Sequence, residues 1–166
     1  MNRKRMLWLC AAALISSAAL LPSRGGAQAK PGGIPKDYRA WAHVKSLVLQ
    51  KGHPLFDAFG GIHHVYVNKK GEAVARKGSG AYPEGTIFVF DLYEAEEGGG
   101  TLAEGRQKVL ATMTKDKKFA ATGGWRWEAY AGGDPAKQIV KDPVSECWAC
   151  HQPQDKSDYV FSKWRQ

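Results

Sequence analysis

Alternation between apolar and polar residues predicts most of the regular structure after residue 60. Residues 62–67 are β-branched and aromatic, and residues 86–93 form the longest such run in the chain. Residues 125–130 alternate large and polar side chains, and residues 106–114 form a further candidate. Because turn residues rather than long helical patterns separate these segments, we expect an antiparallel sheet.

A helical period is present before the first of these strands. The apolar residues that recur at that period are Tyr38, Trp41, Val44 and Val48. They predict an amphipathic helix over residues 36–50, ended by Gly52 and Pro54. Shorter helices are predicted at residues 115–121 and 136–140. The expected fold class is therefore α+β, a mainly antiparallel sheet with a few flanking helices.

The first 29 residues have the three parts of a secretory signal peptide. A basic stretch at residues 2–5 precedes an uncharged apolar run, Met6 to Leu21, and Ala27-Gln28-Ala29 follows as a cleavage site. The alternative, a retained anchor, is disfavoured because the apolar run is shorter than the roughly 20 residues that span a bilayer. We expect a periplasmic protein, without a membrane segment after cleavage, formed by one domain over residues 30–166.

Charge gives no sign of a nucleic-acid partner. The whole chain carries +8, but Arg3, Lys4, Arg5 and Arg24 would leave with the signal, which reduces the net charge to +4. The remaining basic residues are interspersed with acidic ones instead of forming a stripe. A mildly basic, solvated surface accounts for this pattern.

The chemistry concentrates at Cys147-Trp148-Ala149-Cys150-His151, the C-x-x-C-H pattern of covalent haem c attachment. Each thiol adds to one haem vinyl group, the two intervening residues span the vinyls, and the imidazole of His151 binds the iron. A redox disulfide and a zinc site that recruits His63 or His64 are the alternatives. The first belongs near a βαβ unit, and the second needs more ligands at suitable spacing.

The residues after the motif indicate an open sixth position on the iron. An electron-transfer cytochrome c commonly completes its coordination with a downstream methionine, yet residues 152–166 contain neither methionine nor histidine. The one methionine of the mature chain, Met113, lies in a predicted strand and is expected to pack in the core. Ligand binding or ligand chemistry is therefore favoured over simple electron transfer.

At this point the chain resembles the family of cytochrome P460 and the cytochromes c′-beta. The matching blocks, in order, are residues 38–41, 64–68, 82–86, 119–125, 147–151 and 158–161. The resemblance covers nearly all of the mature chain. It implies an antiparallel β fold, often a homodimer, with one five-coordinate haem c.

The resemblance implies two functional types. In cytochromes P460 a lysine is joined to the haem edge and the protein oxidises hydroxylamine, whereas cytochromes c′-beta lack that bond and bind nitric oxide or carbon monoxide. Lys77 best matches the lysine, ahead of Lys69 and Lys70, with a solvated surface lysine as the alternative. Phe90-Asp91 departs from the lysine and glutamate associated with the oxidisers, which favours the c′-beta type.

The distal side of the haem is expected to be capped by aromatic residues. The candidates are Phe59, Tyr82 and Phe88, each of which core packing also explains. Trp125 and Trp127 are expected either near the haem or in the core, and Arg126 could pair with a haem propionate or lie exposed on its strand. Glu128 and Asp134 are candidates for the base that hydroxylamine oxidation requires. His63 and His64 point to opposite faces of their strand. A redox partner protein is a further expectation.

Overall fold

Residues 32–165 are described by a computed structural model. Their strands are β1 (Ala42–Leu49), β2 (Gly61–Val67), β3 (Ile87–Gly98), β4 (Thr101–Lys115) and β5 (Trp125–Ala131). The α-helices are α1 (Phe56–Phe59), α2 (Lys69–Lys77) and α3 (Ala149–His151). Helical turns of other periods are η1 (Tyr38–Ala40), η2 (Lys117–Thr122), η3 (Val144–Trp148) and η4 (Gln152–Ser157). No helix in this part of the chain is long and apolar enough to cross a membrane.

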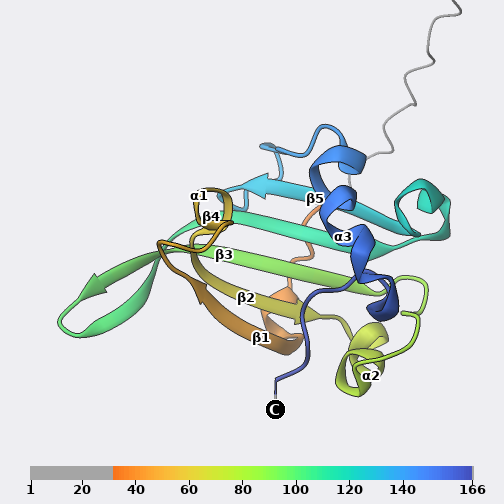
Figure 1. The fold of residues 1–166 in the computed structure, drawn as a ribbon, viewed down its shortest axis with the longest axis horizontal. Coiled ribbons are helices and arrows are strands. Elements are labelled where there is room, and N and C mark those ends of the chain that lie inside the picture. Colours follow the sequence, from red (N-terminus) through yellow and green to blue (C-terminus); the bar gives the residue numbers. More distant parts are fainter. Residues whose placement is uncertain (1–31, 166) are drawn as a thin grey trace, which may run out of the picture. The chain divides into compact units, whose positions relative to one another are not determined.

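The strands form one antiparallel sheet in the order β1-β2-β3-β4-β5, so that each strand pairs with its neighbours in sequence (Figure 1). This confirms the α+β expectation and the strands predicted at residues 62–67, 86–93, 106–114 and 125–130. Strands β3 and β4 extend beyond the others as a long hairpin that turns at residues 98–101. The tip of this hairpin consists of the glycines at residues 98–100.

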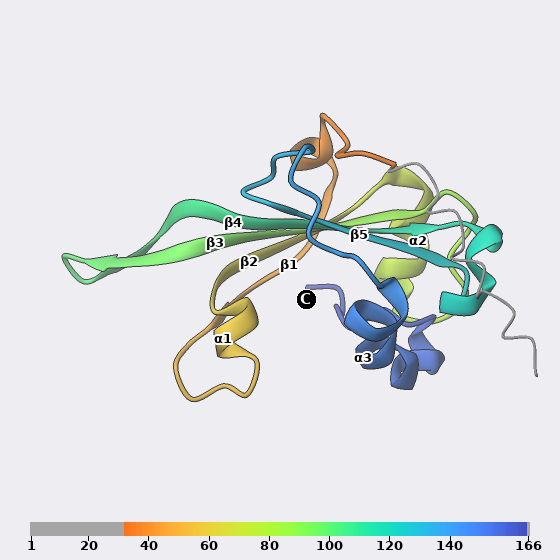
Figure 2. The same cartoon turned by 90° about the horizontal axis from the view of Figure 1, so that it is seen from above.

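The register of the strands assigns side chains to two faces, because directly paired residues of an antiparallel sheet point the same way. Val65, Phe90, Ala111 and Ala129 form one row across four strands and lie on what we call the motif face. His64, Asp91, Leu110 and Tyr130 form a row on the far face. Figure 2 shows α1 and α3 on the same side of the sheet, with α2 at the end of the sheet, where its Val74 and Ala75 pack into the core.

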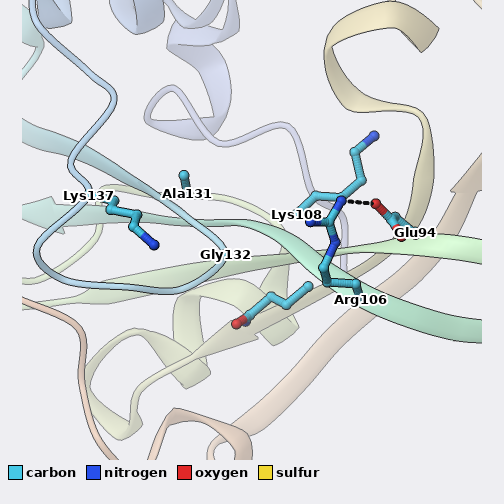
Figure 3. Close-up of a pocket in the computed structure, with 7 residues that line it drawn as sticks. Glu94, Arg106, Lys108, Ala131, Gly132 and Lys137 are labelled. Carbon is cyan, nitrogen blue, oxygen red and sulfur yellow. Dashed lines mark hydrogen bonds and ion pairs between the residues drawn. The ribbon is translucent and has the colours of Figure 1, made fainter.

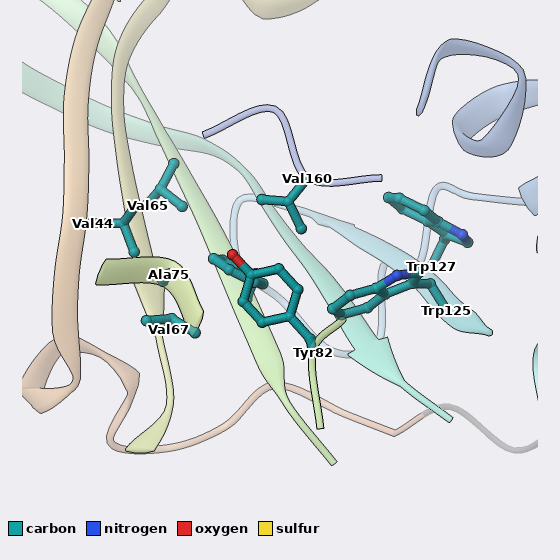
Figure 4. Packing of buried hydrophobic residues seen from close by; sticks show 9 residues of the cluster. Val44, Val65, Val67, Ala75, Tyr82, Trp125, Trp127 and Val160 are labelled. Atoms are coloured by element: carbon teal, nitrogen blue, oxygen red, sulfur yellow. The ribbon is translucent and has the colours of Figure 1, made fainter. Parts of the chain in front are cut away.

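The main core lies on the motif face (Figure 4). Its buried members include Val44, Val65, Val67, Ala75, Tyr82, Phe88, Trp125, Trp127 and Val160. A smaller cluster on the far face consists of Tyr38, Val89, Leu110 and Tyr130, with Ile34 and Trp41 packed against it. The sheet thus separates two apolar layers, and the helices with the C-terminal segment cover the larger one.

The helix predicted for residues 36–50 is wrong. Only the single turn η1 forms there, and the chain then enters strand β1. The apolar residues do not share a helix face, because Tyr38 and Trp41 pack into the far-face cluster whereas Val44 packs into the motif-face core. An irregularity in pairing between His43 and Lys45 accompanies this change of side.

Residues 136–140 also differ from prediction, since they form a turn and an isolated bridge instead of a helix. The Asp134 carboxylate accepts a hydrogen bond from the Ala136 backbone at 2.9 Å, and Gln138 pairs with Tyr130 of β5. Backbone hydrogen bonds to the open edge of β5 therefore replace those of a helix. The helix predicted at 115–121 is present as the short turn η2.

Two helices escaped prediction. Helix α2 begins where the Asn68 side chain accepts a hydrogen bond from the Gly71 backbone, and it ends at Gly78, whose φ of 72° is left-handed. These are the ordinary signals of a helix start and end. Helix α1 is a single turn of four residues, too short for a periodic pattern.

Candidate functional site

The C-x-x-C-H motif lies in a continuous helical segment, residues 144–157, whose hydrogen-bond period changes along its length. Two carboxylates accept backbone hydrogen bonds at the start of this segment. Asp142 accepts from the Val144 N–H at 3.1 Å, and Glu146 accepts from the N–H groups of Lys141 and Asp142. The first turn, η3, is π-helical, a form that often occurs at functional sites.

Helical spacing brings the three motif side chains together, because residues three and four apart are neighbours on a helix surface. Both thiols are free; Cys147 is half-buried and Cys150 is exposed. Burial, with a smaller contribution from the nearby Glu146, raises the pKa of the Cys147 thiol to about 11. The buried Cys147 thiol therefore differs from the low-pKa, accessible thiols that are typical of redox-active cysteines.

The imidazole of His151 is oriented by its neighbours. Its ring lies 4.3 Å from the Trp127 ring and 4.7 Å from the Phe161 ring, and its Nδ1 lies 2.8 Å from the Tyr159 carbonyl oxygen. Because a carbonyl only accepts, Nδ1 carries the proton and Nε2 is left as the electron-pair donor. Burial lowers the pKa of His151, which favours the neutral form that metals bind.

The strip of sheet beside His151 has small side chains. Ala111 and Ala129 are paired on the motif face, and Val109 pairs with Ala131 in the next row. Trp127, under the His151 ring, lies one row from Ala129 on the same strand. These small residues leave a low apolar surface next to the histidine.

The rings of Phe59 and His63 lie on the same face of the sheet, near the start of β2. Phe59 of α1 packs edge-on against Phe90 at 6.2 Å, and the His63 ring packs against Phe90 at 4.8 Å. Phe59 is 40% exposed and Phe161 is 52% exposed, although both are large and apolar. Phe90 of β3 and Trp127 of β5 lie two strands apart, on the order of 10 Å across the sheet. An apolar, flat group would cover these exposed rings.

One further observation indicates that the residues present fit haem. The indole Nε1 of Trp127, beside His151, is buried without a hydrogen-bond partner. A buried donor of this kind calls for a partner that the described residues do not supply. Together with the free Nε2 of His151 and the two free thiols, it matches a prosthetic group with both apolar and polar edges.

Of the three predicted cap residues, only Phe59 lies on the exposed part of the motif face. Tyr82 and Phe88 are buried in the core, where their rings pack 5.1 Å apart and both contact Trp125 (Figure 4). Burial raises the pKa of Tyr82 to about 12. Phe90, which sequence reasoning used only for comparison with the oxidisers, contacts Phe59 instead.

Lys77 lies in the last turn of α2 with its side chain exposed. Next to it, a surface hollow runs from Ala75 and Gly78 to Phe161, whose ring contacts His151. Lys69 is paired with Glu72 on the surface of the same helix. Lys77 therefore lies at the end of a helix whose Val74 and Ala75 pack into the core on the motif face.

Several other candidates point away from His151. Since Trp127 lies on the motif face, its neighbours Arg126 and Glu128 lie on the far face, where they pair at 3.3 Å. Asp134 stabilises the turn after β5. His64 also faces away and pairs with Glu104 at 2.7 Å, whereas His63 is buried on the motif face, as the strand alternation predicts.

A second hollow lies at the end of the alanine strip (Figure 3). Its lining residues are Glu94, Arg106, Gln107, Lys108, Ala131, Gly132 and Lys137. Arg106 pairs with Glu94 at 2.6 Å, and Lys108 Nζ donates to the Gly60 carbonyl at 2.7 Å. The hollow therefore adds a basic rim to an otherwise apolar surface.

Sequence reasoning missed Tyr159, whose carbonyl orients His151, and Asp158 before it. Because they act through backbone groups, their own side chains give no sequence signal. The glycine at position 123 does give one, because it lies against the ring of Tyr159. A Cβ at Gly123 would lie 2.6 Å from the rings of both Trp148 and Tyr159, so a side chain there would displace the C-terminal segment. Among the described residues, no group of three or more His, Cys, Asp or Glu is arranged to hold a metal ion, so the zinc alternative gains no support.

Comparison with known proteins identifies the relatives of this chain. The family model named Cytochrome P460 matches residues 35–162. That range begins before η1 and ends after Phe161, so it includes the whole sheet and the C-x-x-C-H motif. No curated protein matches the chain.

Proposed function

The chain belongs to the cytochrome P460 family and is a haem-binding cytochrome, and from this we propose a periplasmic mono-haem c protein that binds small ligands, of the cytochrome c′-beta type. Cys147 and Cys150 would attach the haem, and His151 would bind its iron. The sixth position would remain open to nitric oxide or carbon monoxide. The signal peptide proposed for residues 1–29 lies outside the described residues.

The observation that carries this proposal is the state of His151. Its Nδ1 is fixed by the Tyr159 carbonyl, so Nε2 is left as a neutral ligand atom. Backbone carbonyl partners are common among metal-binding histidines, because they fix the tautomer and the orientation of the ring. The thiols of Cys147 and Cys150, four positions and one position before His151, lie on the same helical segment.

The surroundings favour neutral ligands over charged substrates. Phe59 and Phe90 form an apolar wall, and the alanine strip beside them offers no hydrogen-bonding side chain. Bound haem iron supplies the coordination chemistry for a diatomic ligand. The wall would exclude water and keep the pocket apolar, while the basic hollow around Lys108 and Lys137 suits the carboxylates of the haem.

Ferrous protein is expected to be high-spin and five-coordinate, and to bind carbon monoxide without displacing a protein ligand. Met113 pairs with Trp127 and packs against the core, so it is not expected to reach the iron. The measurement is the optical spectrum of the purified ferrous protein with and without carbon monoxide, with Met113→Ala for comparison. A low-spin wild-type spectrum that becomes high-spin in Met113→Ala would establish an electron carrier instead.

Hydroxylamine oxidation is the second candidate, and His63 is the observation that favours it. This reaction requires a proton acceptor, and His63 lies on the motif face beside Phe90. Its Nε2 lies 2.5 Å from the Phe59 carbonyl, which leaves Nδ1 as the acceptor, and burial lowers its pKa. The enzyme would also need the bond between Lys77 and the haem edge.

We expect Lys77 to remain unmodified, because its side chain is exposed at the end of α2. Peptide mass spectrometry should find haem on the peptide that contains Cys147 and Cys150 and on no other. Lys77→Arg should leave the ferrous spectrum unchanged, with Lys118→Arg, at an exposed lysine outside the candidate set, as the matched control. A haem peptide that also contains Lys77, together with hydroxylamine-dependent dye reduction that Lys77→Arg abolishes, would make the protein a hydroxylamine-oxidising enzyme.

A homodimer and a redox partner protein remain proposals from the resemblance.

A further inference from the structure

Asp158 and Tyr159 have an unusual backbone. They are the only non-glycine residues in the described range with positive φ, at 49° and 69°. Asp adopts this left-handed conformation more readily than most residues, but it is unfavourable for a large side chain such as that of tyrosine. The surrounding structure must therefore hold Tyr159 in place.

The contacts that hold this segment converge on Asp158. Lys115 Nζ lies 2.6 Å from Oδ1 of Asp158, and the Tyr82 backbone N–H donates to Oδ2 at 2.8 Å. The indole N–H of Trp125 donates to the Asp158 carbonyl at 3.0 Å. The side chains of Lys115 and Asp158 are 16% and 11% exposed, so this ion pair is largely shielded from water and less screened than a surface pair.

The next residue connects this cluster to the candidate haem ligand. Tyr159 accepts the hydrogen bond from His151 Nδ1 through its carbonyl oxygen at 2.8 Å. Its ring packs against Trp148 of the motif at 4.5 Å. The position of that carbonyl depends on the backbone turn at residues 158 and 159, which the Asp158 contacts fix.

We propose that Asp158, paired with Lys115, is a positioning residue for His151 and thereby sets the strength of its bond to iron. This rests on the proposed function, in which His151 binds haem. A hydrogen bond from Nδ1–H to a carbonyl makes Nε2 a stronger donor, because ligand basicity rises with such partners. Stronger donation favours ferric iron and lowers the reduction potential.

The experiment compares Asp158→Ala and Lys115→Met with wild-type holoprotein. Resonance Raman spectra of the ferrous state report the iron–histidine stretch, and redox titration reports the potential. In both variants the stretch should shift to lower wavenumber and the potential to a more positive value. The double variant should show no larger shift than Asp158→Ala alone, because both changes remove the same anchor.

Two variants separate positioning from general destabilisation. Asp158→Asn keeps an oxygen for the Tyr82 N–H and tolerates the left-handed backbone, so its shifts should be smaller than those of Asp158→Ala. Asp155→Ala is the matched control, because within residues 32–165 that exposed carboxylate accepts only from the adjacent Lys156 backbone. It should leave both readouts unchanged. Where Asp158→Ala fails to take up haem, Lys115→Met and Asp158→Asn decide.

Failure of this inference differs from failure of the proposed function. If wild-type ferrous protein shows no iron–histidine stretch, the proposed five-coordinate iron with His151 as its ligand is wrong. If the wild type shows the stretch, but Lys115→Met and Asp158→Asn match Asp155→Ala in both stretch and potential, His151 is a ligand and Asp158 does not position it.

Discussion

Replacing both Cys147 and Cys150 with alanine is expected to convert haem that resists extraction into haem that acidified organic solvent removes almost completely. In the proposed function two thioether bonds hold the group in the wild type, and denaturation would not break them. Each single variant should retain one such bond and load less haem, because a remaining thiol can still react with one vinyl group. His151 is unchanged in all three variants, so any residual haem can still be bound through the iron.

The measurement is haem staining after denaturing electrophoresis, with the extracted haem determined from absorbance. Ala149→Ser is the matched control, since it changes an exposed residue inside the motif without altering its spacing. It should retain haem as the wild type does. Complete extraction of haem from the wild type would rule out covalent attachment through these cysteines.

The elements that could be predicted from sequence are those with a local cause. Strands β2, β3 and β5 alternate or cluster β-branched and aromatic residues, and both faces of the sheet are covered, so their patterns are strong. The false helix at residues 36–50 has a non-local cause. Tyr38 and Val44 are apolar at helical spacing, yet they serve clusters on opposite faces of the sheet.

The same distinction applies to the site. Cys147, Cys150 and His151 lie within five residues, so their spacing alone predicts haem attachment. The wall that faces them is assembled by strand pairing: Phe59 reaches Phe90 only because β2 and β3 are neighbours. Sequence reasoning therefore identified three aromatic candidates but had no means to separate Phe59 from those that fill the core.

Asp91 is a buried carboxylate whose burial was not predicted from sequence, because a charged residue within the apolar strand β3 gives no indication of its partners. Its side chain is 1% exposed on the far face, where it accepts hydrogen bonds from the hydroxyls of Tyr38 at 2.7 Å and Tyr93 at 2.9 Å. Gln107 donates at 2.5 Å, and Arg39 supplies the positive charge at 3.4 Å. Burial and the Asp91 carboxylate raise the pKa of Tyr93 to about 12, so its hydroxyl remains a donor.

Asp91→Ala is expected to lower the free energy of unfolding by about 3–5 kcal/mol, because it leaves a buried cluster of donors without their shared acceptor. Asp91→Asn should cost less, since its amide oxygen still accepts. Glu94→Ala is the control: its exposed pair with Arg106 should contribute less than about 1 kcal/mol. Urea unfolding followed by tryptophan fluorescence measures all three. A loss in Asp91→Ala no larger than in Glu94→Ala would show that the far-face network does not stabilise the sheet on which the motif packs.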